Sequence, residues 1–247
     1  MRKLIFIIRA KILKEKYFKI LFFVLIVFVV GYYSYPEGLS NSQKMAYVTS
    51  YLTTLQLTFG GIFIGIIAGF MLAFLKFLEI KPLNFLIDEY IDVIRGTPIL
   101  IQLMVFTFIV FATWSNSLYA AIIALGLNSS AYVAEIVRSG INSVDKGQME
   151  ASRAMGLSYT QSMKEVVFPQ AIKNILPALA NEFISLFKET SVVGMIGILD
   201  LTMQSQSLQS TLFTAQPILF AAVIYYVSVK FFSYLAKLLE IRLNKHD

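Results

Sequence analysis

Gln148-Met-Glu-Ala-Ser-Arg-Ala-Met-Gly156 is a small, polar, helix-favouring stretch inside a chain that is otherwise rich in long apolar runs. Gly156 can occupy the left-handed conformation that commonly follows the last turn of a helix. Ser158 and Gln161 then form a capping-box pattern, which is typical of the start of another helix. The sequence therefore predicts two short helices joined by a bend at Gly156. They lie within a polar segment, 139–176, that is too long for a simple turn.

The first of these predicted helices has properties of a docking element. Ala151 and Ala154 make one of its sides small enough to enter a groove on a partner protein. Glu150 and Arg153 are three residues apart, so they can form an ion pair on the helix surface. Pro169 is expected to interrupt the helical pattern, because proline has no backbone N–H to donate. We expect the segment to be compact rather than a flexible linker.

The composition indicates an integral membrane protein. Mean hydropathy is +0.70, and 57% of the residues are hydrophobic while 15% are charged. There is no cysteine, which excludes disulfides and thiolate metal sites, and the one histidine, His246, lies in the C-terminal tail. The net charge of +6 is explained by the excess of Lys and Arg on the inner side of membrane proteins rather than by nucleic-acid binding.

Six apolar segments are long enough to cross a bilayer as helices. We expect an amphipathic, interfacial helix at 83–95 and a hydrophilic outer stretch at 200–213. Basic residues concentrate in the segments that this topology places inside, including the first 19 residues, so both termini are predicted to be cytoplasmic. Glycines 61, 65 and 69 follow a G-x-x-x-G spacing that indicates close helix packing. The predicted spans are about 18–35, 51–77, 98–113, 118–138, 177–199 and 214–236.

Polar side chains within two predicted spans are candidates for a substrate pathway, because a charge inside a membrane costs about 2.5–3.5 kcal/mol. Lys188 and Glu189 are expected about 16–18 Å along the fifth span, near the bilayer midplane. The fourth span runs the opposite way, so its polar residues reach a similar depth. Such groups suit the ammonium, carboxylate and side chain of a zwitterionic substrate. The candidates are Asn128, Ser129, Asn181, Glu182, Ser185, Lys188, Glu189, Thr190 and Ser191.

A purely structural explanation of these charges is the alternative. Lys188 and Glu189 can be neutralised by groups on neighbouring helices, although adjacent helical residues do not face each other. Glu135 and Arg138 are simply explained as a local ion pair, since they are three residues apart near the inner end of their helix. Glu182 can be explained either as a residue of the substrate pathway or as a structural charge.

The polar stretch resembles the EAA loop of ABC-importer permeases. The family pattern is Glu-Ala-Ala, three residues, Gly, nine residues and Ile-x-Leu-Pro. This chain has Glu150-Ala-Ser152, Gly156 and Val166-x-Phe-Pro169 at the same spacing. Serine, valine and phenylalanine replace an alanine, an isoleucine and a leucine, which are mild changes in size. Further similarity to the polar amino-acid branch of these permeases covers about residues 50–240, on Arg95-Gly-Thr-Pro98, Ser130–Gly140, Leu176-Pro177 and Lys188-Glu-Thr-Ser191.

The resemblance implies an all-α membrane protein with a five-helix type I importer core in residues 46–240. One extra helix would lie in 1–45 and a cytoplasmic tail in 241–247. The implied partners are ABC ATPase subunits that bind ATP-Mg, a second or homologous permease, an extracytoplasmic solute-binding protein, an amino acid of the histidine, glutamine or arginine type, and membrane lipid. The implied location is the prokaryotic plasma membrane. The residues that would couple to the ATPase are Glu150, Ala151, Ser152, Arg153, Gly156 and Pro169.

Two other functional classes remain as alternatives. The sequence has no G-x-x-x-x-G-K-[ST] phosphate loop, so we expect a transport subunit without a cofactor and without its own ATP chemistry. A self-contained secondary transporter or channel, driven by an ion gradient, would explain Lys188 and Glu189 equally well, but it gives no reason for the segment 139–176. A membrane enzyme has little support, because no set of nucleophilic or metal-binding residues is suitably spaced. Lys188-Glu-Thr-Ser191 and Asp200 favour a substrate with a basic or amide side chain.

Overall fold

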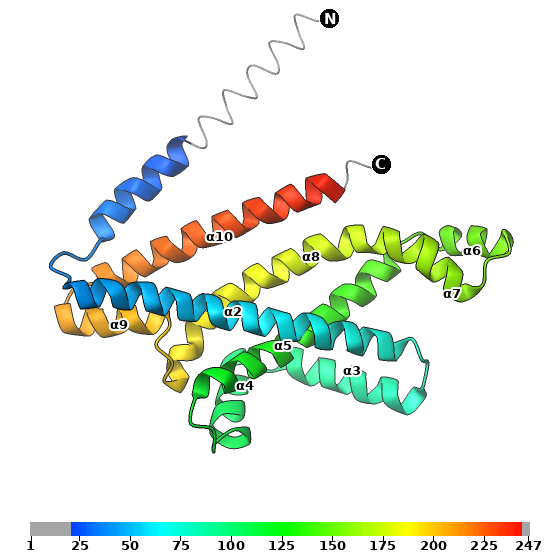
Figure 1. Ribbon diagram of the computed structural model, residues 1–247, viewed down its shortest axis with the longest axis horizontal. Helices are drawn as coiled ribbons and strands as arrows, with labels where there is room; N and C mark the ends of the chain where they lie inside the picture. Colours follow the sequence, from blue (N-terminus) through cyan, green and yellow to red (C-terminus); the bar gives the residue numbers. More distant parts are fainter. Residues whose placement is uncertain (1–20, 244–247) are drawn as a thin grey trace, which may run out of the picture.

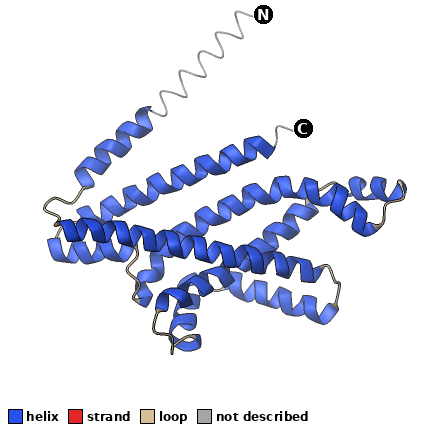
Figure 2. Ribbon diagram, in the orientation of Figure 1, coloured by secondary structure: helices blue, strands red, loops and turns tan. Residues whose placement is uncertain are grey.

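The computed structural model describes residues 21–243, and this part of the chain is built from helices without any strand (Figures 1 and 2). The predicted all-α fold is confirmed for these residues. His246 and the first part of the predicted 18–35 span lie outside them. The helices are an N-terminal helix (Leu21–Ser34), α2 (Asn41–Lys76), α3 (Lys81–Gly96), α4 (Ile99–Val105), α5 (Ser117–Asn142), α6 (Lys146–Ala154), α7 (Tyr159–Ser162), α8 (Phe168–Glu189), α9 (Leu201–Leu212) and α10 (Gln216–Leu243).

Helices α2 and α5 form a closely packed central pair. A Cβ atom added at Gly65 would lie 2.7 Å from Cβ of Ser129, and one added at Gly69 would lie 2.5 Å from Cβ of Val133. Real Cβ atoms do not approach so closely, so the two backbones can be this near only where side chains are absent. The interpretation of the G-x-x-x-G spacing as a packing site is confirmed.

Three helices are long and apolar enough to cross a membrane by themselves: α2, α5 and α10. They differ in their surroundings. The 18-residue apolar stretch of α5 is 67% buried inside the protein, whereas that of α10 is only 11% buried. Helix α5 is therefore central. Helix α10 is peripheral and presents most of its surface to lipid or to another subunit.

The predicted 98–113 span is shorter than expected. Its helical part is α4 followed by one π-helical turn, Phe106–Val110. Helix α3, the expected amphipathic helix, meets this unit at a bend of 109°. Twelve helical residues extend about 18 Å, too little to cross the hydrocarbon core of a bilayer. Only the bent pair of α3 and α4 together meets the length and apolarity of a membrane span.

The predicted limits 177–199 of the fifth span were wrong. Helix α8 begins at Phe168, and Pro177 lies inside it rather than at its start. The chain is helical without a break from Tyr159 to Glu189, with a π-helical turn at Met163–Val167 directly before α8. After α8, residues Thr190–Ile196 form a 3-10 helix. The misplacement arose because a proline is more often found in the first turn of a helix than in its interior.

The segment 200–213 was expected as a hydrophilic stretch and is in fact a regular helix, α9. Asp200 caps its N-terminus by accepting hydrogen bonds from the backbone N–H groups of Thr202 (3.0 Å) and Met203 (2.9 Å). The hydroxyl of Thr54 on α2 accepts a hydrogen bond from the N–H of Leu201 (3.2 Å). These contacts fasten the start of α9 to the central helix α2.

Candidate functional site

The polar segment 139–176 contains two short helices, α6 and α7, joined by a bend. We call α6, α7 and the bend between them the knuckle. Gly156 has φ +93°, in the left-handed region. The N–H of Gly156 donates to the carbonyl of Arg153 (3.0 Å) and the N–H of Leu157 to that of Ser152 (3.2 Å), which is the pattern of a Schellman motif. A capping box of Ser158 and Gln161 then starts α7. The predicted helix–glycine–helix shape is confirmed.

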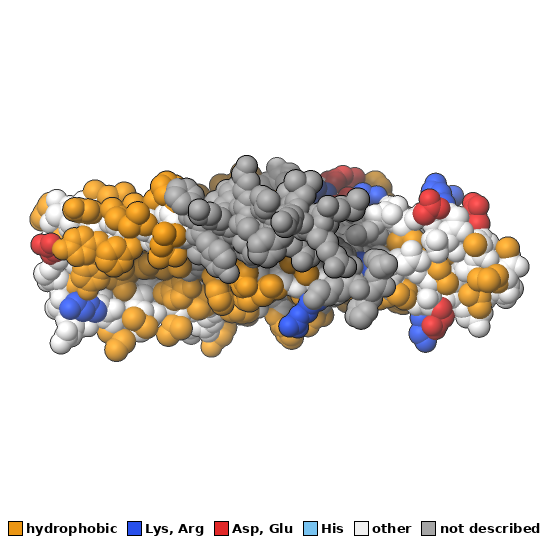
Figure 3. Space-filling model, turned by 90° about the horizontal axis from the view of Figure 1, so that it is seen from above, with side chains coloured by type: hydrophobic (Ala, Val, Ile, Leu, Met, Phe, Trp, Pro, Cys, Tyr) orange, Lys and Arg blue, Asp and Glu red, His pale blue; other side chains and the backbone are white. Residues whose placement is uncertain are grey.

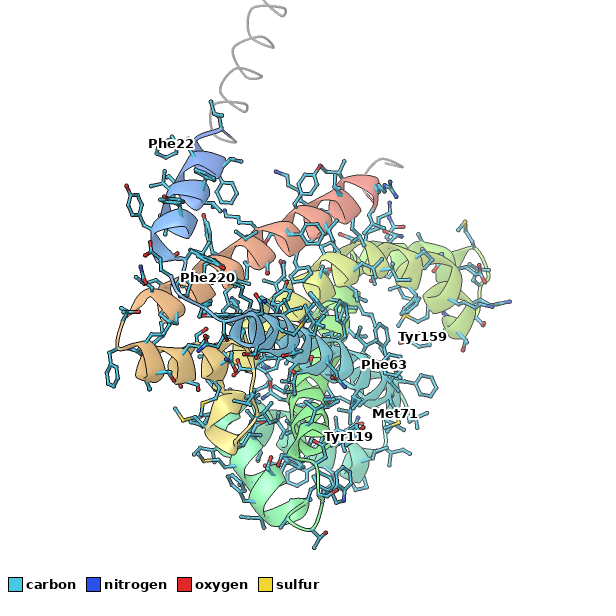
Figure 4. The ribbon with its side chains drawn as sticks, turned by 60° about the vertical axis from the view of Figure 1, so that its left-hand side comes forward. Phe22, Phe63, Met71, Tyr119, Tyr159 and Phe220 are labelled. Atoms are coloured by element: carbon cyan, nitrogen blue, oxygen red, sulfur yellow. The ribbon has the colours of Figure 1, made fainter. Side chains whose placement is uncertain are left out.

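The knuckle exposes a small apolar tip far from α9 (Figure 1). Met155 and Tyr159 lie on either side of Gly156 in the chain, and their side chains are 76% and 56% exposed. Figure 4 shows Tyr159 at this end of the molecule. Ala151 and Ala154 on α6 are exposed as well. Charged side chains of both signs gather at the same end of the molecule, whereas hydrophobic side chains dominate the opposite end (Figure 3). An apolar tip within a charged surface is suited to a protein partner.

Two of the predicted coupling residues, Ser152 and Arg153, make side-chain hydrogen bonds within the knuckle. Ser152 is only 1% exposed and its hydroxyl donates to the carbonyl of Met149 (2.8 Å), so it points into the knuckle rather than towards a partner. The guanidinium of Arg153 donates to the carbonyl of Leu157 (2.8 Å) across the bend. The ion pairs among the described residues do not include the suggested pair of Glu150 and Arg153. Glu150 is left on the surface.

The knuckle is tied to the long helices behind it. The amide of Gln170 on α8 donates to the side chain of Gln148 on α6 (3.3 Å). Asn174 on α8 donates to the hydroxyl of Ser143 at the end of α5 (2.7 Å). Pro169 follows the π-helical turn and lies in the first turn of α8, where its missing N–H costs least. These contacts connect α6 to α8, and α8 to the end of α5.

The second group of predicted residues lies along α8. The carboxylate of Glu182 accepts a hydrogen bond from the hydroxyl of Ser129 on α5 (2.8 Å), so these two helices do bring polar groups together. Asn181 and Lys188 are exposed and Ser185 is half-buried. These three residues follow helical spacing and form one face of α8, which we call the α8 polar face.

Asn128 and Thr190, by contrast, are built into the interior. Asn128 is 3% exposed and donates to the side-chain oxygen of Gln102 on α4 (2.9 Å). The amide of Gln102 donates to the carbonyls of Ile94 (2.7 Å) and Thr97 (3.0 Å), so this network holds the bend between α3 and α4 against α5. Thr190 is fully buried and donates to the carbonyl of Phe187 (2.8 Å). Neither side chain reaches the α8 polar face.

The α8 polar face borders a cleft of about 450 Å³. Lys188 and Ser191 line one wall, and α9 and α10 supply the other walls. Further polar residues from α9 and α10 line this cleft. They were not among the predicted site residues, although the concentration of Ser, Thr and Gln in 202–210 was a signal for them. The hydroxyls of Thr202 and Tyr225 share a hydrogen bond (3.2 Å). The polar residues that complete the cleft are Thr202, Ser205, Gln206 and Tyr225.

Three charged residues near the C-terminal end of α8 form no ion pair with another described residue. Elsewhere the structure pairs Lys76 with Asp88 and Glu135 with Arg138, the second of which confirms the predicted local pair. Glu182, Lys188 and Glu189 take part in no such pair. The explanation of Lys188 and Glu189 as neutralised structural charges therefore has no support from a partner in this part of the chain.

Asp200, just outside α8 and its 3-10 extension, is completely buried. Burial raises the pKa of its carboxyl above the usual value, while hydrogen bonds from the N–H groups of Met203 and Thr202 act in the opposite direction. The hydroxyl of Tyr225 also donates to this carboxylate (3.3 Å). Asp200 thereby joins α9 to α10 behind the cleft.

The model of the family "Binding-protein-dependent transport system inner membrane component" matches residues 61–245. The arginine transport system permease protein ArtQ of Bacillus subtilis is 39% identical over 198 residues, which are 78% of this chain and 90% of that protein. A putative glutamine transport system permease protein of Rickettsia typhi is 36% identical, over 76% of this chain and 88% of the relative.

Solved structures agree in fold. The crystal structure of an amino acid ABC transporter with histidines is 43% identical to this chain, with a TM-score of 0.77, and covers 81% of this chain and 94% of that one. The MetNI methionine ABC transporter in an inward-facing conformation has a TM-score of 0.74 at 21% identity, over 84% of this chain and all of that one. At 21% identity, the similarity to MetNI concerns the fold alone.

Proposed function

This chain belongs to the family of binding-protein-dependent transport system inner membrane components, as a permease subunit of an ABC amino-acid importer, and we propose that a separate ATPase subunit drives it through the knuckle. The apolar tip at Met155 and Tyr159 is the contact surface for that subunit. The chain itself has no phosphate-binding loop, so ATP-Mg is bound and hydrolysed by the partner.

The observation that carries this proposal is the combination of an exposed tip with a firm attachment. The bend is closed by the backbone hydrogen bonds of Gly156 and Leu157, and Gln148 connects α6 to α8. A movement of the ATPase surface is thus passed to a helix that continues to Glu189. Coupling residues on the outer side of the knuckle are Glu150, Ala151, Arg153 and Pro169, whereas Ser152 supports them from inside.

The α8 polar face supports a role in the substrate pathway. An amino acid carries a carboxylate and an ammonium group, so its pathway needs groups of both charges. We propose that Lys188 binds the carboxylate of the substrate and that Glu182 binds its cationic group. Glu189 supplies a second negative charge for the cationic group. The absence of ionic partners for these side chains within the described residues leaves their charges available to a ligand. A substrate with a basic or amide side chain fits two carboxylates and one lysine.

The remaining partners follow from the family. The exposed α8 polar face meets a second permease, identical or homologous, so that the pathway lies between two chains. A solute-binding protein delivers the amino acid at the end of the molecule where α9 lies. The chain is a multi-pass protein of the prokaryotic inner membrane, and we propose that both of its termini are cytoplasmic.

Reconstitution in vesicles tests this function. Uptake of a labelled basic amino acid should require the ATPase, ATP on the knuckle side and the binding protein. It should persist when an ionophore collapses ion gradients. Uptake that continues without ATP but stops with the ionophore would instead identify a secondary transporter. A Met155→Asp, Tyr159→Asp double variant should reach the membrane in normal amounts yet lose co-purification of the ATPase. The exposed-site variant Lys164→Gln serves as the matched control.

A further inference from the structure

A second cleft, of about 340 Å³, lies between α2, α10 and the connection after the N-terminal helix. Its walls are almost entirely aromatic or apolar. The residues that line it are Tyr35, Leu39, Lys44, Tyr47, Val48, Tyr51, Phe220 and Ile224. Six of these, from Tyr35 to Tyr51, precede residue 61, where the match to the family model begins, and Tyr35 and Leu39 also precede α2. The cleft is therefore partly built by the N-terminal extension of this chain.

Aromatic contacts give the cleft a defined shape. The ring of Phe220 lies edge-on to Tyr35 and Tyr47, with centroid distances of 5.3 Å and 5.7 Å. The hydroxyl of Tyr47 donates to the carbonyl of Pro217 (3.2 Å), and that of Tyr51 shares a hydrogen bond with Ser228 (2.8 Å). The polar ends of both tyrosines are thus bonded to α10, and their rings are left as an apolar wall.

The N-terminal helix contacts α10 at Phe23 and Gly31, while most of its other residues are exposed. Phe23 lies 5.7 Å from the ring of Tyr226, and the ammonium of Lys230 lies over both rings, at 6.0 Å and 5.5 Å. Nearer the cleft, the side chain of Val223 on α10 lies against Gly31. Together with the contact of Tyr35 with Phe220, these contacts place the connection that carries Tyr35 beside the cleft.

Lys44 supplies the one charged side chain of the cleft. It lies on the first turns of α2, and its ammonium group takes part in no ion pair among the described residues. Val48, Tyr51 and Leu52 lie deeper along the same helix, about 6–12 Å from the level of Lys44. Val48 and Leu52 are more than half exposed. The surface therefore offers a cation at one end and an apolar track leading from it.

From this geometry we propose that the cleft binds an anionic phospholipid, with its phosphate at Lys44 and an acyl chain along Val48 and Ile224. An unpaired lysine beside tyrosine rings is suited to a headgroup phosphate at the membrane interface, and the apolar track is suited to hydrocarbon. The cleft lies on a face that α10 leaves open to the membrane. A soluble ligand would gain little from walls without further polar groups. The N-terminal extension thus acts as one side of a lipid site.

Native mass spectrometry of the full-length chain, purified in its complex from the membrane, tests this proposal. Dioleoyl phosphatidylglycerol and dioleoyl phosphatidylcholine share acyl chains and differ in net charge, so they separate headgroup from tail recognition. The wild type should retain phosphatidylglycerol in preference to phosphatidylcholine. Lys44→Gln should weaken that retention about fivefold, since one lysine near an anionic headgroup contributes about that factor. Lys237→Gln, which removes an exposed lysine elsewhere on α10, should leave it unchanged.

A second variant tests the apolar part. Val48→Trp fills the track from an exposed position, so it should lower the retention of both lipids without affecting the amount of protein in the membrane. Equal retention of phosphatidylglycerol by the wild type and Lys44→Gln would overturn the proposal. So would equal retention of the two lipids by the wild type. Loss of binding-protein docking in Lys44→Gln with unchanged lipid retention would assign the cleft to a protein instead. These readouts need no ATP, so they are independent of the knuckle.

Discussion

The knuckle and the α8 polar face are connected by the continuous helical run Tyr159–Glu189 but are stabilised in different ways. The knuckle closes on itself through the backbone hydrogen bonds of Gly156 and Leu157 and the cap of Ser158. The α8 polar face borders a cleft with walls from α9 and α10, and its one charged residue, Lys188, takes part in no ion pair among the described residues. The region that we propose as the ATPase contact is closed by its own hydrogen bonds, whereas the region that we propose as part of the substrate pathway leaves a charged side chain without an ion pair among the described residues.

The largest effect is expected from Gly156→Val. A β-branched residue in the left-handed conformation costs about 1–2 kcal/mol or more, and the free space around Gly156 shows that the strain is in the backbone alone. The bend should open, and ATP-dependent uptake should fall roughly tenfold or more while the protein still reaches the membrane. Gly156→Asn is the matched control, because asparagine tolerates this conformation. Normal uptake by the valine variant would show that the bend is dispensable.

The next effect concerns charge in the pathway. Glu182→Gln keeps an acceptor for Ser129 but removes the negative charge, so uptake of a cationic amino acid should fall about tenfold and that of a neutral one much less. Glu189→Gln should act in the same direction. Glu165→Gln makes the same change of charge on the exposed π-helical turn and should have no effect. Equal losses for cationic and neutral substrates would remove Glu182 from substrate recognition.

A smaller effect is expected at the bend between α3 and α4. Asn128→Leu leaves the side-chain oxygen of Gln102 without its donor, which should lower the free energy of unfolding by about 1–3 kcal/mol. Thermal unfolding in detergent would measure this loss. The ratio of cationic to neutral uptake should stay constant. A changed ratio with unchanged stability would return Asn128 to the substrate pathway, where the sequence analysis placed it.

The smallest effect is expected from Ser152→Ala, which restores the alanine of the EAA pattern. The hydroxyl bonds only within the knuckle, to Met149, so its loss should change the stability by no more than about 0.5 kcal/mol. ATPase co-purification and uptake should both match the wild type. A marked loss of either would mean that Ser152 contacts the partner despite its burial.

The sequence predicted the knuckle well because its determinants are local. Gly156, Ser158 and Gln161 act on backbone groups within a few residues, so their spacing alone specifies the bend and the cap. The glycine spacing of α2 was informative for a similar reason, since glycines repeating at every fourth position of a helix indicate a close neighbour. The sequence did not identify that neighbour as α5.

The helix limits and the cleft depended on contacts that a sequence pattern does not contain. Pro177 indicated a helix start, but α8 begins at Phe168 after a π-helical turn, which no propensity predicts. Asn128 was assigned by its depth alone, whereas its orientation towards Gln102 is a matter of tertiary packing. Thr202 and Tyr225 were missed because they become neighbours of Lys188 only when α9 and α10 fold back against α8.

The glycine contacts of α2 limit which parts of the transporter can move. Because Gly65 and Gly69 bring the backbone of α2 directly against Ser129 and Val133 of α5, the two helices lack room to slide or rotate past each other, so they behave as a single rigid body. Alternation between inward-open and outward-open states is therefore expected at other contacts, such as that of α8 with α10. The immobile pair then serves as the frame against which the other helices swing during each transport cycle.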